Sequence, residues 1–446
     1  MHRALIESPC CFVRRLGGNR RNEIRFHRLL RHKKVTVLEM AAAAGARCGA
    51  VAAGRDVAVI QDTSEIYAGG KELAEKGFGP IGKGGATRGV LAHVAIAVDV
   101  ADGGLLGVAD LAVWTRQGGQ AAAPARNRAY ADKESYCWLR TAKAAGERLK
   151  SARSITVVSD AESDIYDYFA GKPEGVELLV RARHDRGLAA AGNEGLNEAF
   201  EKMNKRRPAL VSEALAGLAA AQKIAFQVPA IPGRKARAAT LSLRFAAVTV
   251  ERPGDGAKSL PESLAISIVE VREEAPPEGV EPLHWRLVTS HKVEDVKRAT
   301  EIVAMYRGRF QIEELFRTMK SGAIDIESAG IEHAKAFITF TAFAAIAACS
   351  ILQMVKARDG TTGQPVTLVF DPEDMPLLKA LCRKLEGKTV KQKNPHSPDN
   401  LAYATWIIAR LGAWNGYYGK PGPKTIRWGY QRFQAIKQGF QLSDEM

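Results

Sequence analysis

The sequence predicts an α/β fold class, and three observations lead to this prediction. Strand-like apolar runs alternate with helix-like stretches between residues 56 and 186. Two of the runs are separated by Asp102-Gly-Gly, a turn signal that indicates neighbouring antiparallel strands. The composition, 46% hydrophobic and 25% charged over 446 residues, is typical of a folded globular chain with two or three domains.

The expected elements follow in chain order. The first 55 residues are basic and then Ala-rich, with a helix expected around residues 22–44. Next, the pattern predicts three strands, a helix, a strand, a short helix and a strand, at residues 57–62, 91–100, 105–114, 133–149, 155–160, 162–170 and 176–182. A three-strand meander followed by helix, strand, helix and strand is the element order of the ribonuclease H-like fold. We therefore expect that fold for the core.

The second half of the chain completes the expected domain organisation. Alternating runs separated by Pro and Gly clusters predict an antiparallel β insertion at residues 187–296. The core resumes as a long helical region at residues 297–360, and a basic C-terminal region covers residues 361–446. Residues 336–355 contain no charge and could span a bilayer, but they are Ala-rich and interrupted by Thr, Ser and Gln. We expect a buried core helix there and no membrane partner.

Positive charge is concentrated at the two ends of the chain. The formal net charge is +15. Residues 1–40 hold ten basic and three acidic side chains, and residues 383–446 hold eleven and four, so each end carries +7. The middle of the chain is therefore nearly neutral. Two basic flanks predict a polyanionic partner, for which nucleic acid is the best candidate, with a merely basic soluble surface as the alternative.

Cysteine usage and a Gly-rich stretch argue against two other kinds of site. The six cysteines show neither CxxC spacing nor a histidine at zinc-finger spacing, which disfavours structural zinc and favours a reducing cytoplasm. The stretch Gly77-Phe-Gly-Pro-Ile-Gly82 matches GxGxxG, but it follows a charged helical stretch and leads into a strand. A phosphate-binding loop has the opposite context, so we interpret this stretch as a turn.

Two aspartates end expected strands. Asp62 is the last residue of the first expected strand, and Asp160 is the last residue of the fourth. Each alone is most often a turn or helix-cap residue. In the expected fold these strands are neighbours, so the two carboxylates would meet at one edge of the sheet. Clustered carboxylates need a cation, and oxygen ligands select magnesium or manganese.

A third candidate element is a charged helical stripe near residue 310. At 100° per residue, five polar side chains fall within an arc of about 80° on one expected helix: Tyr306, Arg309, Glu313, Arg317 and Lys320. The alternative is the solvated face of an ordinary amphipathic helix. A carboxylate flanked by a tyrosine, two arginines and a lysine is nevertheless what a metal ligand beside a phosphate-binding site requires.

These residues resemble a known family. Tyr306-x2-Arg309-x3-Glu313-x6-Lys320 is similar to the YREK signature of bacterial insertion-sequence DDE transposases, the cut-and-paste, hairpin-forming group with a ribonuclease H-like core. Other similar segments occur in the family's order over roughly residues 20–440. They are Ile60-Gln-Asp62-Thr63, Lys133-Glu-Ser-Tyr-Cys-Trp138, Asp160-Ala-Glu162-Ser-Asp164 and Trp285.

The resemblance implies a catalytic site and its metal. Asp62, Asp160 and Glu313 would form the acidic triad and bind two Mg2+ or Mn2+ ions for phosphodiester hydrolysis and strand transfer. Trp285 would stack against a flipped base. The other DNA-binding candidates are Tyr306, Arg309, Arg317, Lys320, Arg181 and Arg183.

The resemblance also implies partners and a location. The partner would be double-stranded DNA, both the element ends and the target, bound by a homodimer in the synaptic complex. The location would be the bacterial cytoplasm, in association with the nucleoid. Residues 1–55 would be a DNA-end-binding region, and only 61 residues before Asp62 makes a truncated version one interpretation. Two alternatives stay open: a catalytically silent DNA-binding derivative, and a ribonuclease H-like nuclease without strand transfer.

Overall fold

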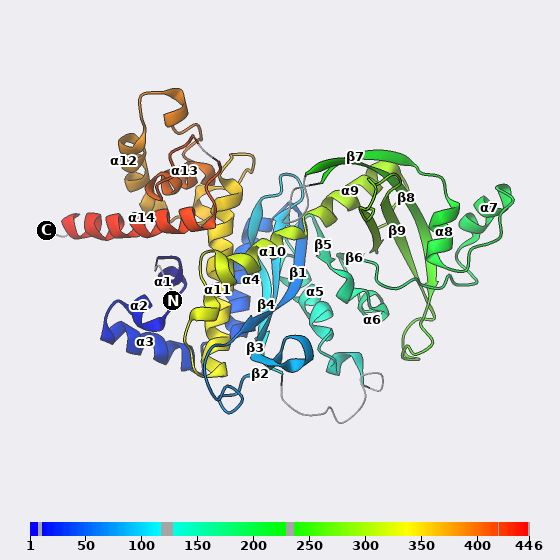
Figure 1. The fold of residues 1–446 in the computed structure, drawn as a ribbon, viewed down its shortest axis with the longest axis horizontal. Helices are drawn as coiled ribbons and strands as arrows, with labels where there is room; N and C mark the ends of the chain where they lie inside the picture. The colour runs from blue at the N-terminus through cyan, green and yellow to red at the C-terminus, as the bar shows by residue number, and fades with distance from the viewer. Residues whose placement is uncertain (8–10, 117–127, 229–235, 418, 445–446) are drawn as a thin grey trace. The chain divides into compact units, whose positions relative to one another are not determined.

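The protein is a mixed α/β protein with a ten-strand mixed sheet and helical N- and C-terminal regions (Figure 1). The computed structural model describes residues 1–7, 11–116, 128–228, 236–417 and 419–444. The chain divides into two compact units. Unit 1 contains residues 1–120, 147–154 and 310–446, and unit 2 contains residues 121–146 and 155–309.

The sheet of unit 1 contains the predicted three-strand meander and one further strand, β2 (Gly79–Ile81), which lies in the Gly-rich stretch that was interpreted as a turn. Strand β3 (Thr87–Asp99) pairs antiparallel with β1 (Asp56–Tyr67), β2 and β4 (Leu105–Trp114). The bounds of β4 are those predicted, and the turn before β4 places Gly103 at φ 73°. The end predicted for the first strand was wrong. β1 continues five residues beyond Asp62, because the half-buried segment from Thr63 to Glu65 keeps its pairing with β3.

Helices cover this sheet and form the two terminal regions of unit 1. The N-terminal helices are α1 (His2–Glu7), α2 (Val13–Gly17), α3 (Arg20–Arg31) and α4 (Val37–Ala52). The single helix predicted at residues 22–44 is in fact α3 and α4, because Thr36 caps α4 by accepting a hydrogen bond from the Glu39 amide. The C-terminal helices are α12 (Met375–Leu385), α13 (Leu401–Leu411) and α14 (Pro423–Asp444).

One helix of unit 1, α11 (Ala334–Ala357), is long and apolar enough to cross a membrane. It packs against β3, β4, α4, α13 and α14, and 78% of its most apolar window is buried inside the protein. This burial agrees with the prediction of a core helix.

Unit 2 combines a parallel strand pair with an antiparallel set. Strand β5 (Ser154–Ser159) is followed by α6 (Tyr166–Ala170) and by β6 (Val176–Arg181), which pairs parallel with β5. Helix α5 (Tyr136–Arg148) precedes them. The region predicted as a β insertion supplies α7 (Glu194–Lys202), α8 (Val211–Gly217) and four antiparallel strands: β7 (Gln222–Val228), β8 (Arg237–Glu251), β9 (Ser263–Glu273) and β10 (His284–Thr289). β10 pairs with β6, so the insertion extends the sheet.

The predicted charged helix is broken near its middle. Helix α9 (Val296–Arg307) ends before Gly308, and α10 (Phe310–Arg317) begins two residues later, followed by a π-helical turn at residues 318–322. Glycine has a low helix propensity. The amides of Gly308 and Arg309 donate to carbonyls three residues back, which is the 3-10 pattern common in the last turn of a helix. The prediction that one continuous helix carries all five polar residues was therefore wrong.

Candidate functional site

Asp62 lies on β1 between two residues that are anchored to β3. The side chains of Gln61 and Thr63 lie on the opposite face of the strand from Asp62. Both bond to His93, with 3.0 Å between Gln61 Oε1 and Nε2 and 2.8 Å between Thr63 Oγ1 and Nδ1. His93 is fully buried on β3, directly opposite Thr63 in the register. The network fixes the β1 backbone on both sides of Asp62.

The half-buried carboxylate of Asp62 is also oriented locally. Its Oδ1 accepts a hydrogen bond from the amide of Thr63 at 2.7 Å. Sequence reasoning missed His93. The available signal was a single histidine within an otherwise apolar strand.

Glu313 belongs to the same unit as Asp62. It lies in the first turn of α10 with an exposed side chain, while Ile312, Leu315 and Phe316 form the buried face of this helix. Helix α10 contacts β1 and β3. Packing therefore brings the elements that carry Asp62 and Glu313 into contact within unit 1.

Asp160 and Asp164 of the second acidic motif have different surroundings in unit 2. Asp160 is half-buried after β5, and its Oδ1 accepts a hydrogen bond from the Glu162 amide at 2.9 Å. The Asp164 side chain is fully buried and paired with Arg186, and its Oδ2 accepts hydrogen bonds from the amides of Arg183 and His184 at 2.7 and 2.9 Å. Asp164 thus has a structural role in holding the segment after β6.

Tyr306 is the centre of a charged cluster in unit 2. It is 3% exposed at the end of α9 and hydrogen-bonds to Arg309. Burial raises the pKa of its phenol. The charges of Arg309 and Arg181 oppose that shift, and the carboxylate of Asp160 adds to it. The phenol therefore stays neutral at physiological pH and can donate a hydrogen bond. The structure brings together four of the predicted site residues here.

An aromatic cluster adjoins this group. The half-buried ring of Trp285 on β10 contacts Phe226 and Tyr306 edge-on, with centroid distances of 5.7 and 6.0 Å. The guanidinium of Arg307 lies over the Phe226 ring, 4.7 Å from its centroid. Sequence reasoning missed Phe226 and Arg307, although the alternation of Ile224, Phe226 and Val228 indicates that Phe226 belongs to one face of a strand.

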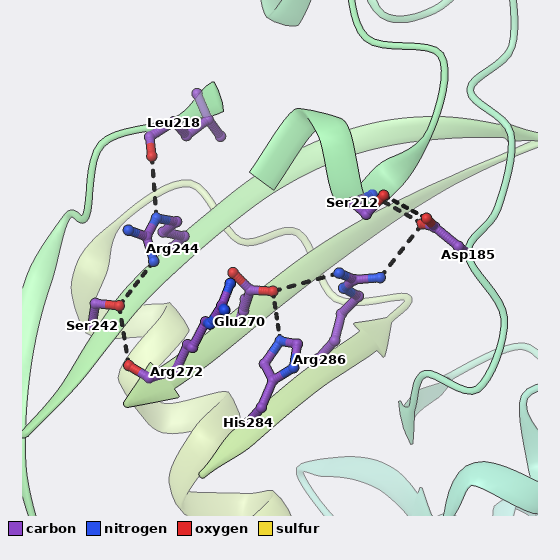
Figure 2. Close-up of polar contacts among 9 residues, drawn as sticks. All are labelled: Asp185, Ser212, Leu218, Ser242, Arg244, Glu270, Arg272, His284 and Arg286. Atoms are coloured by element: carbon purple, nitrogen blue, oxygen red, sulfur yellow. Dashed lines mark hydrogen bonds and ion pairs between the residues drawn. The ribbon is translucent and has the colours of Figure 1, made fainter. Parts of the chain in front are cut away.

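The neighbours of Trp285 anchor β10 from its other face. Figure 2 shows His284 and Arg286 pointing toward Glu270 on β9. His284 Nε2 lies 2.8 Å from Glu270 Oε1, and Arg286 makes longer contacts of 3.6 Å with Glu270 and 3.4 Å with Asp185. Sequence reasoning missed this network.

Glu270 carries a negative charge within that network. Its residue is 5% exposed. Burial raises the pKa of its carboxyl, but His284, Arg286 and Arg244 outweigh burial, and the pKa is lowered overall. The ionised carboxylate of Glu270 contacts His284 and Arg286, the two neighbours of Trp285 on β10. These contacts fix the side of the strand from which the Trp285 side chain projects.

The other predicted DNA-binding residues are distributed over both units. Arg183 is exposed after β6, and its backbone amide donates a hydrogen bond to Asp164. Arg317 is exposed on α10, and Lys320 is half-exposed in the π-helical turn. The predicted stripe is therefore divided: Tyr306 and Arg309 belong to unit 2, whereas Glu313, Arg317 and Lys320 belong to unit 1.

Two further findings concern metal binding by the chain and the protein family to which it belongs. In the part of the chain that the structure describes, no group of three or more His, Cys, Asp or Glu side chains is arranged to hold a metal ion. The chain matches no protein-family model.

Proposed function

We propose that the chain is a DDE-type DNA transposase with a ribonuclease H-like core. The observation that carries the proposal is the cluster of Arg181, Tyr306 and Arg309 beside Asp160, with Trp285 packed on Tyr306. Tyr306 and Arg309 belong to the segment that resembles the YREK signature, whereas Asp160, Arg181 and Trp285 come from elements elsewhere in the chain. The meander of β1, β3 and β4 and the parallel pair β5 and β6 support the proposed core.

The cluster suits a DNA backbone beside an unstacked base. Arg181 and Arg309 supply positive charge for phosphate oxygens, and the neutral phenol of Tyr306 supplies a hydrogen-bond donor. The half-buried indole of Trp285 offers a face for stacking, which contributes about 1 to 3 kcal/mol per base. In the proposed reaction, Trp285 stabilises the flipped base that accompanies hairpin formation.

Asp62, Asp160 and Glu313 are the proposed ligands of two Mg2+ or Mn2+ ions. Their oxygen-only donor set fits these hard cations. The backbone amides of Thr63 and Glu162 orient the two aspartates by hydrogen bonds. When bound, such ions activate water or a 3′-hydroxyl and stabilise the leaving oxygen.

We propose double-stranded DNA, both element ends and target, as the partner of a homodimer in a bacterial cytoplasm. The test is a cleavage and strand-transfer assay on DNA carrying the element's own ends. Asp62→Asn, Asp160→Asn and Glu313→Gln should each abolish cleavage and leave DNA binding largely intact. The matched control Glu332→Gln, at an exposed carboxylate of unit 1, should cleave normally.

Each other outcome contradicts the proposal in a defined way. DNA binding without any cleavage by the wild type would indicate a silent derivative. Cleavage without joining would indicate a nuclease. Near wild-type cleavage by any of the three acidic variants would remove that residue from the triad.

A further inference from the structure

Unit 1 contains a cavity that the YREK signature does not include. It has a volume of about 420 Å³ and lies among α10, the end of α11 and the start of α14. Its apolar lining includes Leu352, Val355 and Pro423. Its charged lining residues are four cations and one carboxylate: Arg317, Lys356, Arg358, Lys424 and Glu314.

Only one of these cations is neutralised by an ion pair within the cavity. Lys356 Nζ lies 2.7 Å from a carboxylate oxygen of Glu314. Arg317 and Lys424 are exposed and make no ion pair within the residues that the structure describes. A cavity with an excess of positive charge attracts anions, because the cations repel one another until a counter-charge binds.

Arg358 is another cation of the cavity. One of its terminal nitrogens donates to the carbonyl of Pro421 at 3.0 Å. Its Nε is buried and has no hydrogen-bond partner in the described structure. The side chain of Arg358 lines the cavity, so its guanidinium adds to the positive charge there.

The start of α14 adds donors of the same kind. Helix α14 begins at Pro423, which has no amide hydrogen, and it follows Gly422, which has no side chain to cap the helix. The next amides are those that a helix leaves unsatisfied, and they carry the positive end of its dipole. Anions bind at such positions.

We propose that this cavity binds a backbone phosphate of DNA, held by Arg317, Arg358 and Lys424. The apolar lining accommodates the adjoining sugar. The inference rests on the proposed function, because it assigns DNA as the source of the phosphate. It also gives the basic C-terminal region a specific contact next to α10.

The test is DNA binding by the full chain, measured with a short duplex as a function of salt. Arg317→Ala, Arg358→Ala and Lys424→Ala should each weaken binding equally across DNA sequences and reduce the slope of log affinity against log salt by about 1. Lys335→Ala is the matched control, because it removes an exposed cation at the other end of α11. It should change neither quantity. Arg317→Ala, Lys424→Ala and the control should keep the wild-type melting temperature, whereas Arg358→Ala also loses its hydrogen bond to Pro421, so its binding is compared at a temperature where it is folded.

The outcomes separate this inference from the proposed function. Wild-type DNA affinity and slope in the cavity variants would overturn the inference, whether or not the chain cleaves DNA. If the cavity variants weaken DNA binding and reduce the salt slope as expected, but the wild type cuts no DNA, the inference is supported and the proposed transposase function is contradicted. Stabilisation of the wild type by inorganic phosphate, absent from the variants and without any change in DNA binding, would identify a small-anion site and overturn the inference. A wild type that binds no DNA would overturn both.

Discussion

The ring of Trp285 meets that of Tyr306 edge-on, with centroids 6.0 Å apart and planes inclined at 62°. The two residues come from β10 and α9, and they differ in exposure. Tyr306 is almost fully buried, whereas Trp285 is half-buried. Trp285 is thus packed on one side and accessible on another, which is the arrangement that a stacking residue needs.

This arrangement predicts the behaviour of Trp285→Ala. The substitution removes edge-on packing against Phe226 and Tyr306, and such aromatic pairs contribute about 0.5 to 1.5 kcal/mol each beyond area burial. We expect a modest fall in melting temperature, a nearly normal first nick and a strong loss of hairpin product. Trp285→Phe should restore part of the hairpin product. A parallel loss of nick, hairpin and melting temperature would instead show a purely structural tryptophan.

Removing the charge of Asp164 should lower the stability of the fold much more than removing the charge of Asp160. Asp164→Asn leaves buried Arg186 without its partner, and breaking such a pair costs about 3 to 5 kcal/mol. Asp160→Asn should barely change stability, because asparagine is an equally good cap. Urea unfolding of both variants measures this difference. Equal stability losses would contradict the separate roles.

His291 should make unit 2 less stable in acid. Burial, followed by the charge of Arg298, lowers the pKa of its ring from 6.5 to about 4. Arg298 donates to Nδ1 at 2.8 Å, and Nε2 lies 2.8 Å from Thr156 Oγ1, so folding favours the neutral ring. The stabilisation is complete above about pH 6.5 and is lost as pH falls toward 4.

The measurement is the free energy of unfolding at pH 7 and pH 5. His291→Gln should be less stable than the wild type at pH 7 and should lose less stability between the two pH values. Half-buried His2, whose pKa is also lowered to about 4, keeps its own contribution in that variant. An unchanged pH dependence would contradict the role assigned to His291.

Helix α3 should contribute to the salt dependence of DNA binding. Its exposed residues Arg21, Arg25 and Arg28 fall on one face at 100° per residue. Changing all three to Gln should flatten log affinity against log salt, by about 0.9 for each phosphate that the helix no longer neutralises. The control Lys223→Gln removes an exposed cation of β7. Equal slopes for the triple variant and the wild type would show that α3 does not bind DNA.

This substitution is a better test than deletion of residues 1–40. Leu5 and Ile6 of α1 are buried, and α1 contacts α11 and α14. A deletion would therefore remove part of the core together with the positive charge.

Local patterns predicted much of the secondary structure. The apolar runs gave β4 its correct bounds, because a fully buried strand shows in the sequence as a continuous apolar segment. The position of Asp62 within β1 was not predictable in this way, since polar residues beyond it pair with β3 although they are only half-buried. The break at Gly308 was hidden because the apolar periodicity continues into α10.

The surroundings of the site were less predictable than its residues. The candidates Asp160, Tyr306 and Arg309 were chosen by spacing and resemblance, and their role stays a prediction. The anchoring of Trp285 depends on Glu270 and Asp185, which are far from it along the chain. Pairings of this kind arise from the strand register, which no local periodicity contains.

The pairing of β6 with β10 has a consequence for how the protein is synthesised. Leu287 of β10 is opposite Arg181 of β6, so the partner of this edge leaves the ribosome about 100 residues after the edge itself. Until then β6 presents unpaired amides and carbonyls, which can template aggregation. Closing so long a segment costs entropy before the pairing is gained, which makes this a slow step. We therefore expect chains truncated between residues 182 and 283 to aggregate, because they lack β10 and leave the β6 edge of the sheet unpaired.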